Sequence, residues 1–200
     1  MINLYDAKKL VIRKSLHILI VFTPALAAFS YPLAVLLLSS GIVFFAFVES
    51  LRFHTRPPVW KPAVCIAQIT LFASHRRDKD RFVLGPITLG AGALCVLLCF
   101  DPHTAALGIY ALAAGDSLAG LAGRLFGRCR PRILCGKSLE GSLACFFVIA
   151  GITGLVTGSW KEALVAALAG TTAEALPIED FDNILLPFSV SAVLTLFNHA

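Results

Sequence analysis

Apolar residues follow one another along this sequence in stretches long enough to cross a membrane, separated by short polar segments. A helix needs about 20 apolar residues to span the hydrocarbon core of a bilayer, and about 17 are sufficient. The pattern predicts seven spanning helices, at residues 15–29, 31–48, 84–100, 102–123, 142–158, 160–175 and 183–197. We therefore expect an all-α fold, a polytopic helical bundle embedded in the membrane.

Two further features of the pattern complete the predicted organisation. Residues 62–74 are apolar but too short to span, and basic residues flank them, so we expect an interfacial helix lying on the membrane surface. The N-terminus has the basic start and apolar stretch of a signal peptide, but the many apolar stretches after it favour a retained first helix. No repeat or soluble linker divides the chain, so residues 1–200 are expected to form one membrane-embedded domain.

Composition supports the membrane interpretation. The 200 residues are 58% hydrophobic and only 14% charged, whereas about 25% of the residues in a typical soluble domain are charged. The mean hydropathy is +0.82. A soluble chain of this size leaves too much surface exposed to hide so many apolar side chains in one core. The bilayer is therefore the expected solvent.

The net charge of +5 is explained by membrane orientation. With a cytoplasmic N-terminus and seven spans, all of the 17 Lys and Arg residues except Lys161 fall on the cytoplasmic side, as the positive-inside rule requires. We therefore expect the chain to lie in a lipid bilayer, the inner membrane if it is bacterial, and to bind no nucleic acid. The six cysteines show no CxxC pair and no metal spacing, which favours reduced, packed thiols.

An acidic residue, Asp116, interrupts the predicted helix at residues 102–123. An ionised carboxylate inside a membrane helix is costly, so it should face a wet cavity or a cation; a structural hydrogen bond between helices is the alternative. Gly115, Ala119, Gly123 and Gly127 recur every four residues and so share one helix face. That face favours close helix packing, and its bare backbone also suits the approach of a phosphate.

The loop after this helix carries five basic residues, from Arg124 to Lys137, and no acid. A solvated cytoplasmic loop has the same composition, but this one ends in a group suited to phosphate. Lys137 supplies a charge and Ser138 a hydroxyl for phosphate, and Glu140 supplies an oxygen ligand for Mg²⁺. The Gly-Lys-Ser triplet lacks the glycine spacing of a nucleotide-binding P-loop and follows no predicted strand.

Polar residues distant in sequence fall on the same predicted side of the membrane. Arg13 and His17 lie one helical turn apart, with Lys14 beside Arg13; an interfacial anchor is the alternative interpretation. Glu174 and Asp182 belong to an acidic segment before the last predicted helix, where a carboxylate can bind metal or cap the helix.

The residues from Asp116 to Gly141 resemble the CTP-binding signature of the dolichol kinase, phytol kinase and CTP-dependent diacylglycerol kinase family. That signature reads D-x-x-A-x-x-x-G-x-x-x-G, eight variable residues, then K-K-T-x-E-G. The matching residues are Asp116, Ala119, Gly123, Gly127, Lys137, Ser138, Glu140 and Gly141. Gly136 stands in place of the first Lys and Ser138 in place of Thr; neighbouring arginines can supply the missing charge. Residues 13–17, residues 49–52, Glu174 and residues 182–187 resemble further family motifs.

The resemblance implies a catalytic membrane domain that transfers the γ-phosphoryl group of CTP to a polyprenol, a phytol-like alcohol or diacylglycerol. We expect Asp116 and Glu140 to hold Mg²⁺, with Asp182 or Glu174 as further ligands. His17 or an acid would deprotonate the lipid hydroxyl, and Lys137, Arg124 and Arg13 would contact phosphates. The residues expected to bind the nucleotide are Ala119, Gly123, Arg124, Gly127, Ser138, Gly141, Arg13 and Lys14.

Two other functions are considered. A phosphatidate cytidylyltransferase shares part of the central motif, but such enzymes usually carry a PGHGG-type segment followed by D-R-x-D, and this sequence has nothing like it. A non-enzymatic transporter suits an intramembrane acid and a glycine face, but no pair of corresponding broken helices is apparent. The acceptor alcohol and the oligomeric state stay open.

Overall fold

The computed structural model describes residues 17–54, 82–131, 134 and 136–198. These residues form helices, and no strand occurs among them. The elements in chain order are α2 (Thr23–Phe29), α3 (Tyr31–His54), α5 (Gly85–Cys99), α6 (Pro102–Tyr110), η2 (Ala111–Asp116), α7 (Ser117–Leu125), α8 (Leu139–Thr157), α9 (Trp160–Ala175), η4 (Glu179–Phe181) and α10 (Asp182–Asn198). The predicted all-α fold is confirmed.

Helices occupy all seven predicted spans, but fewer of them have the length to cross a bilayer. Three helical stretches of the described chain are long and apolar enough: Tyr31–Leu51, Pro102–Leu125 and Leu139–Thr157. The apolar helices His17–Phe29, Gly85–Cys99 and Asp182–Asn198 are shorter. Seven crossings therefore stay a prediction, and the predicted interfacial helix at residues 62–74 lies outside the described residues.

The first predicted helix is interrupted. Residues 17–20 are helical, a turn follows at Val21 and Phe22, and α2 begins at Thr23 with Pro24 in its first turn. Proline lacks a backbone N–H, and its ring clashes with the carbonyl group of the preceding helical turn. It therefore suits a helix start and not a helix interior. The break separates His17 from the rest of the hydrophobic segment.

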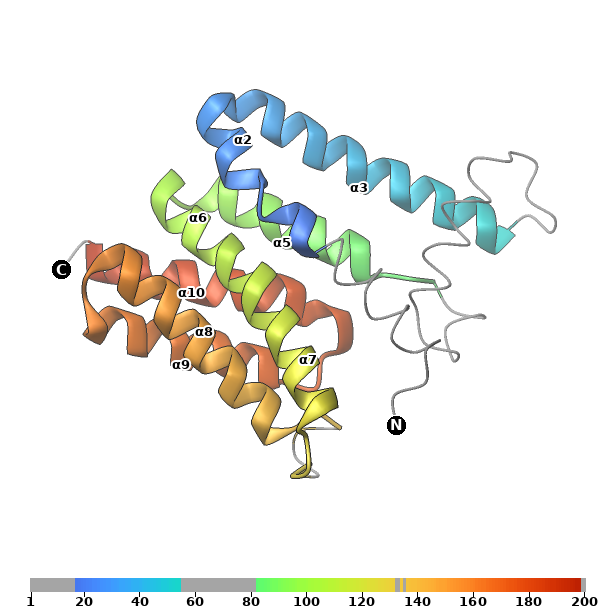
Figure 1. The fold of residues 1–200 in the computed structure, drawn as a ribbon. Helices are drawn as coiled ribbons and strands as arrows, with labels where there is room; N and C mark the ends of the chain where they lie inside the picture. Colours follow the sequence, from blue (N-terminus) through green and yellow to red (C-terminus); the bar gives the residue numbers. More distant parts are fainter. Residues whose placement is uncertain (1–16, 55–81, 132–133, 135, 199–200) are drawn as a thin grey trace.

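The helices that carry the polar residues pack together in a group of four. In Figure 1, α7 and α8 meet at the loop that joins them, and α9 and α10 lie beside α8. Helix α8 packs against α9, α9 against α10, and α7 against α8. Close approach of α5 to α10 depends on Gly92, whose missing side chain leaves room for the backbone carbonyl of Asn183. The structure thus brings the end of α9 and the start of α10 close to the α7–α8 connection.

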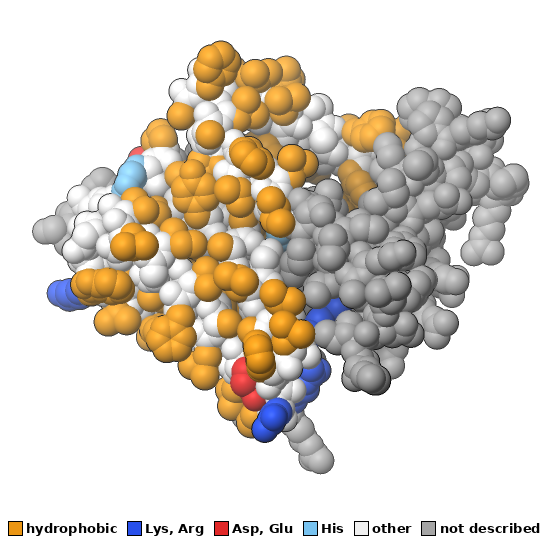
Figure 2. Space-filling view, in the orientation of Figure 1, with side chains coloured by type: hydrophobic (Ala, Val, Ile, Leu, Met, Phe, Trp, Pro, Cys, Tyr) orange, Lys and Arg blue, Asp and Glu red, His pale blue; other side chains and the backbone are white. Residues whose placement is uncertain are grey.

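Large apolar side chains cover much of the outer surface. Figure 2 shows them in orange over most of the described face, with charged side chains mainly at the end below α7. Phe29, Leu155 and Leu196 each expose more than two thirds of their surface, at 85%, 83% and 72%. Soluble monomers rarely expose contiguous apolar patches of this extent, so the surface agrees with an integral membrane protein.

Candidate functional site

A cavity of about 400 Å³ lies where α7, the start of α8, the end of α9 and the start of α10 meet. Nine residues predicted from the sequence line it: Asp116, Ala119, Gly123, Arg124, Lys137, Ser138, Gly141, Glu174 and Asp182. Four more were not predicted as site residues: Gly120, Arg130, Gly136 and Ser142. The polar residues therefore converge on one place, although they come from four helices and a loop.

Asp116 occupies a distinctive backbone position. It is the last residue of the π-helix η2, which interrupts the long helix between Pro102 and Leu125. A π-helix adds an extra residue to a helical turn and occurs frequently at functional sites. Asp116 Oδ2 lies 3.3 Å from Nδ1 of His17, a residue with only 3% of its surface exposed. The structure thus joins two predicted catalytic residues that are far apart in sequence.

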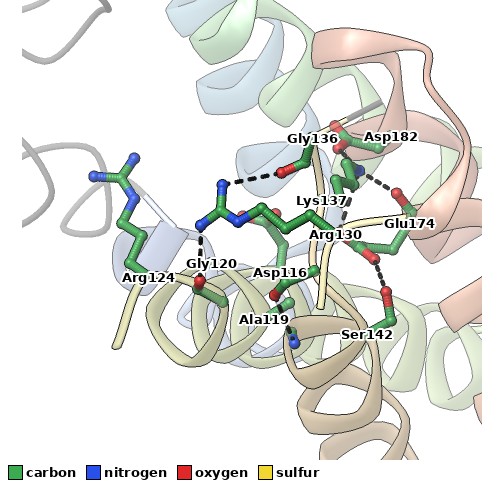
Figure 3. A pocket seen from close by; sticks show the side chains of 13 residues that line it. Asp116, Ala119, Gly120, Arg124, Arg130, Gly136, Lys137, Ser142, Glu174 and Asp182 are labelled. Atoms are coloured by element: carbon green, nitrogen blue, oxygen red, sulfur yellow. Dashed lines mark hydrogen bonds and ion pairs between the residues drawn. The ribbon is translucent and has the colours of Figure 1, made fainter. Parts of the chain in front are cut away.

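Lys137 connects three structural elements at the cavity. Its Nζ lies 2.8 Å from Oδ2 of Asp182 at the start of α10 and 3.2 Å from Oε1 of Glu174 near the end of α9. Nζ also donates to the backbone carbonyl of Glu174. Ser142 Oγ donates to Glu174 Oε2 over 3.3 Å. Figure 3 shows this cluster beside Asp116.

The electrostatic setting keeps Lys137 charged. Partial burial alone would lower its pKa, but the carboxylates of Asp182 and Glu174 outweigh that effect and raise the pKa above its ordinary value. At neutral pH the cavity therefore contains an ammonium group that lies between Asp182 and Glu174.

The small residues of α7, and Gly127 just after it, pack directly against the start of α8. A side chain at Gly123 would come within 2.7 Å of Ser138 Oγ, and one at Gly127 within 2.8 Å of Ser138 Cβ. A side chain at Gly141 would come within 2.8 Å of the carbonyl oxygen of Ala119. The glycine face therefore serves helix packing, while Ala119 and Gly123 also line the cavity. Gly127 is not among the lining residues.

Glu140 lies outside the cavity lining and shapes the preceding loop. Its Oε1 accepts hydrogen bonds from the backbone N–H groups of Arg128 and Cys129, at 2.9 and 3.1 Å. Its Oε2 is buried and has no hydrogen-bond partner within the described residues. Ser138, three residues before Gly141, caps α8 by accepting from the Gly141 N–H over 3.1 Å. Glu140 and Ser138, near the end of the signature, thus stabilise the preceding loop and the start of α8.

Two arginines contribute to the cavity. Arg130 donates from Nη1 to the carbonyl of Gly136 and from Nη2 to that of Gly123, at 3.3 and 3.2 Å. Arg124 extends to one side (Figure 3). The predicted phosphate ligands Arg13 and Lys14 lie outside the described residues.

Helical spacing contained a signal for one of the unpredicted residues. Ser142 follows Ser138 by four positions and so shares its helix face. Nothing in the spacing marked Arg130 among the basic residues of the loop.

Asn183, at the start of α10, has only 2% of its surface exposed and donates to Thr88 Oγ1 over 3.2 Å, so it serves the packing of α10 on α5.

The carboxylates of the cavity offer oxygen donors to a cation. Asp116, Glu174 and Asp182 all line it, but the described residues include no cluster of three His, Cys, Asp or Glu side chains arranged around a metal position. Mg²⁺ usually takes only one or two protein carboxylates and completes its shell with water and substrate phosphates. The donors thus fit a phosphate-bound Mg²⁺ better than an all-protein metal cage.

Comparison with known proteins agrees with the signature. The chain is 28% identical over 133 residues to a probable phytol kinase, chloroplastic, of Triticum aestivum, which covers 58% of this chain and 44% of that protein. It is 31% identical over 128 residues to dolichol kinase of Saccharomyces cerevisiae; the aligned region covers 64% of this chain and 23% of that protein. The resemblance to the phytol and dolichol kinase family is confirmed. The chain spans less than half the length of either relative. No family model matches it, and no solved structure does.

Proposed function

We propose that this protein is a CTP-dependent lipid kinase that transfers the γ-phosphoryl group to the hydroxyl of a membrane lipid alcohol. The observation that carries the proposal is the meeting of the signature residues Asp116, Gly123 and Lys137 in one cavity with Glu174 and Asp182. The named functions of the two relatives support it, because phytol and dolichol are both long-chain alcohols.

The residues that line the cavity support phosphoryl transfer as its chemistry. Such transfer depends on charge neutralisation and positioning more than on covalent chemistry by the protein. Lys137 and Arg124 would contact the phosphates, together with the predicted Arg13 and Lys14. The small residues Ala119, Gly120 and Gly123 in the cavity wall would let a phosphate approach α7 closely, and Ser142 adds a hydroxyl.

A magnesium ion would be held by Asp116 together with Glu174 or Asp182, and when bound it would neutralise phosphate charge. Glu140 stays a second candidate ligand through Oε2, since its Oε1 already accepts from two backbone N–H groups. We favour Asp116 because it lines the cavity and Glu140 does not.

The acceptor hydroxyl must lose a proton, and His17 is our candidate base. A neighbouring carboxylate orients an imidazole, and Asp116 is placed to do this at 3.3 Å. The adjacent Ile18 and Leu19 expose 58% and 66% of their surfaces, which suits contact with the apolar part of a lipid. We further propose that the cavity faces the cytoplasm, on the side to which the basic residues are assigned.

Labelled CTP tests the proposal directly. Purified protein in liposomes should transfer label from γ-labelled CTP to phytol, a polyprenol or diacylglycerol, and Asp116→Ala should not. Lipid labelling from α-labelled CTP would instead indicate a cytidylyltransferase, and solute flux without nucleotide turnover would indicate a transporter. Parallel reactions with γ-labelled ATP would establish the donor.

A further inference from the structure

Arg130 joins the two walls of the cavity. Its guanidinium donates to the carbonyl of Gly123 in α7 and to the carbonyl of Gly136, immediately before Lys137. The two carbonyls lie on segments at opposite ends of the connecting loop, and Figure 3 shows Arg130 reaching toward Gly136. One planar group therefore fixes the position of the Lys137 segment relative to α7.

The geometry of the bridge requires a guanidinium. Arginine has five N–H donors in a rigid planar fork, whereas lysine has a single ammonium centre. The two hydrogen bonds use both terminal nitrogens, at 3.2 and 3.3 Å, and the guanidinium has further N–H groups to donate. Since Arg130 is exposed at the cavity, these groups can reach a ligand.

Arg130 makes no direct ion pair with an acid in the part of the chain that the structure describes. Its hydrogen-bonding partners are neutral carbonyls, and its charge acts on the carboxylate of Glu140 only from a longer distance. The charge of Lys137, in contrast, is shared with Glu174 and Asp182. Arg130 therefore contributes more of the cavity's uncompensated positive charge than Lys137 does.

The backbone explains why this charge does not come from position 136. Gly136 has φ of +100°, a conformation that glycine adopts readily and residues with a side chain adopt only under strain. A lysine at this position, as in the family signature, would have to change the backbone that Arg130 now holds. Arg130, which donates to the carbonyl of Gly136, supplies the positive charge instead.

We infer that Arg130 is a phosphate-binding residue of this chain, which holds the Gly136–Lys137 segment in place and contacts the phosphates of the bound nucleotide. The inference rests on the proposed function, because the ligand is the triphosphate of the phosphoryl donor. Charge-assisted bonds from arginine to phosphate are short and strong and carry geometric specificity. Arg130 should consequently affect nucleotide affinity and leave lipid affinity unchanged.

The test compares Arg130→Ala and Arg130→Lys with Arg128→Ala. Arg128 lies in the same loop, is exposed and does not line the cavity, so its removal is a matched change of charge. Steady-state kinetics in liposomes would give kcat and separate KM values for CTP and phytol, and equilibrium dialysis would give the affinity for labelled CTP. Guanidinium chloride at millimolar concentration would be added to Arg130→Ala.

We expect Arg130→Ala to raise the KM and Kd for CTP about tenfold or more, with the KM for phytol unchanged. Arg130→Lys should fall between wild type and Arg130→Ala, guanidinium should restore part of the affinity, and Arg128→Ala should stay within about twofold of wild type. Equal CTP affinities in Arg130→Ala and Arg128→Ala would overturn the inference, as would a loss that neither lysine nor guanidinium restores. A wild-type protein that binds CTP through Arg130 but labels no lipid would overturn the proposed function and leave this inference standing.

Discussion

The Nζ of Lys137 lies 2.8 Å from Oδ2 of Asp182, although the two residues are 45 positions apart in the sequence. This ion pair connects the signature segment before α8 to the first residue of α10. Glu174 completes the cluster from α9. The pairing means that the lysine expected to bind phosphate also holds three elements together, so its substitution should affect both stability and activity.

Lys137→Met should destabilise the protein by about 2 kcal/mol, because removing one partner of a partly buried ion pair leaves the other charges uncompensated. Thermal unfolding in detergent would measure the loss. Adding Asp182→Asn to Lys137→Met should recover part of the stability, as expected for residues in direct contact. Additive effects of the two substitutions would contradict a direct interaction.

The stabilisation by Lys137 should persist to alkaline pH. The pKa of Lys137 is raised in the folded protein, above the ordinary lysine value of 10.5. A raised pKa means that the stabilisation is fully present below the unfolded-state pKa and is lost as the pH rises through the folded-state value. The difference in melting temperature between wild type and Lys137→Met should thus be constant from about pH 7 to 9 and shrink above about pH 10.5. A difference that already shrinks below pH 9 would argue against the raised pKa.

His17→Gln should lower kcat about a hundredfold or more if His17 accepts the proton of the lipid hydroxyl, since general base catalysis contributes roughly 10²–10⁴-fold. The residual activity of His17→Gln should also lack the acid limb that the wild type shows in the pH dependence of kcat. Ile18→Ala is the matched control, because Ile18 is the exposed neighbour of His17. A His17→Gln enzyme with unchanged pH dependence would assign His17 a structural role.

Magnesium titrations should distinguish Asp116 from Glu140 as a ligand of the ion. Asp116→Asn should raise the Mg²⁺ concentration needed for half-maximal activity at least several-fold, because Asp116 lines the cavity. Glu140→Gln should mainly lower the melting temperature, because its Oε1 accepts from two backbone N–H groups. If Glu140→Gln shifts the Mg²⁺ requirement as strongly as Asp116→Asn, Glu140 is a ligand.

The helices could be predicted because lipid solvation requires long apolar stretches. The predicted span at residues 84–100 corresponds to Gly85–Cys99, and that at residues 183–197 to Asp182–Asn198. The π-helix at Ala111–Asp116 could not be predicted, because the choice between α and π hydrogen bonding depends on neighbouring helices.

The residues of the cavity were more predictable than their interactions. Charge distribution and motif spacing indicated that Lys137, Glu174 and Asp182 lie on one side of the membrane, but only tertiary packing brings them into contact. The carboxylate of Glu140 suits a metal ion and a pair of backbone amides equally well, so its sequence position cannot decide between them. Arg130 was one basic residue among several, and its bridge depends on where two distant carbonyls are placed.

The position of Asp182 at the first residue of α10 has a consequence for biogenesis. Helices leave the ribosome in chain order, so α7 and α8 are made before α10. Until α10 is inserted, Lys137 lacks one of its two acidic partners and the cavity lacks a wall. A nascent chain arrested before Asp182 should therefore be unable to retain the proposed nucleotide, and the competence to bind it should arise only once α10 has been made.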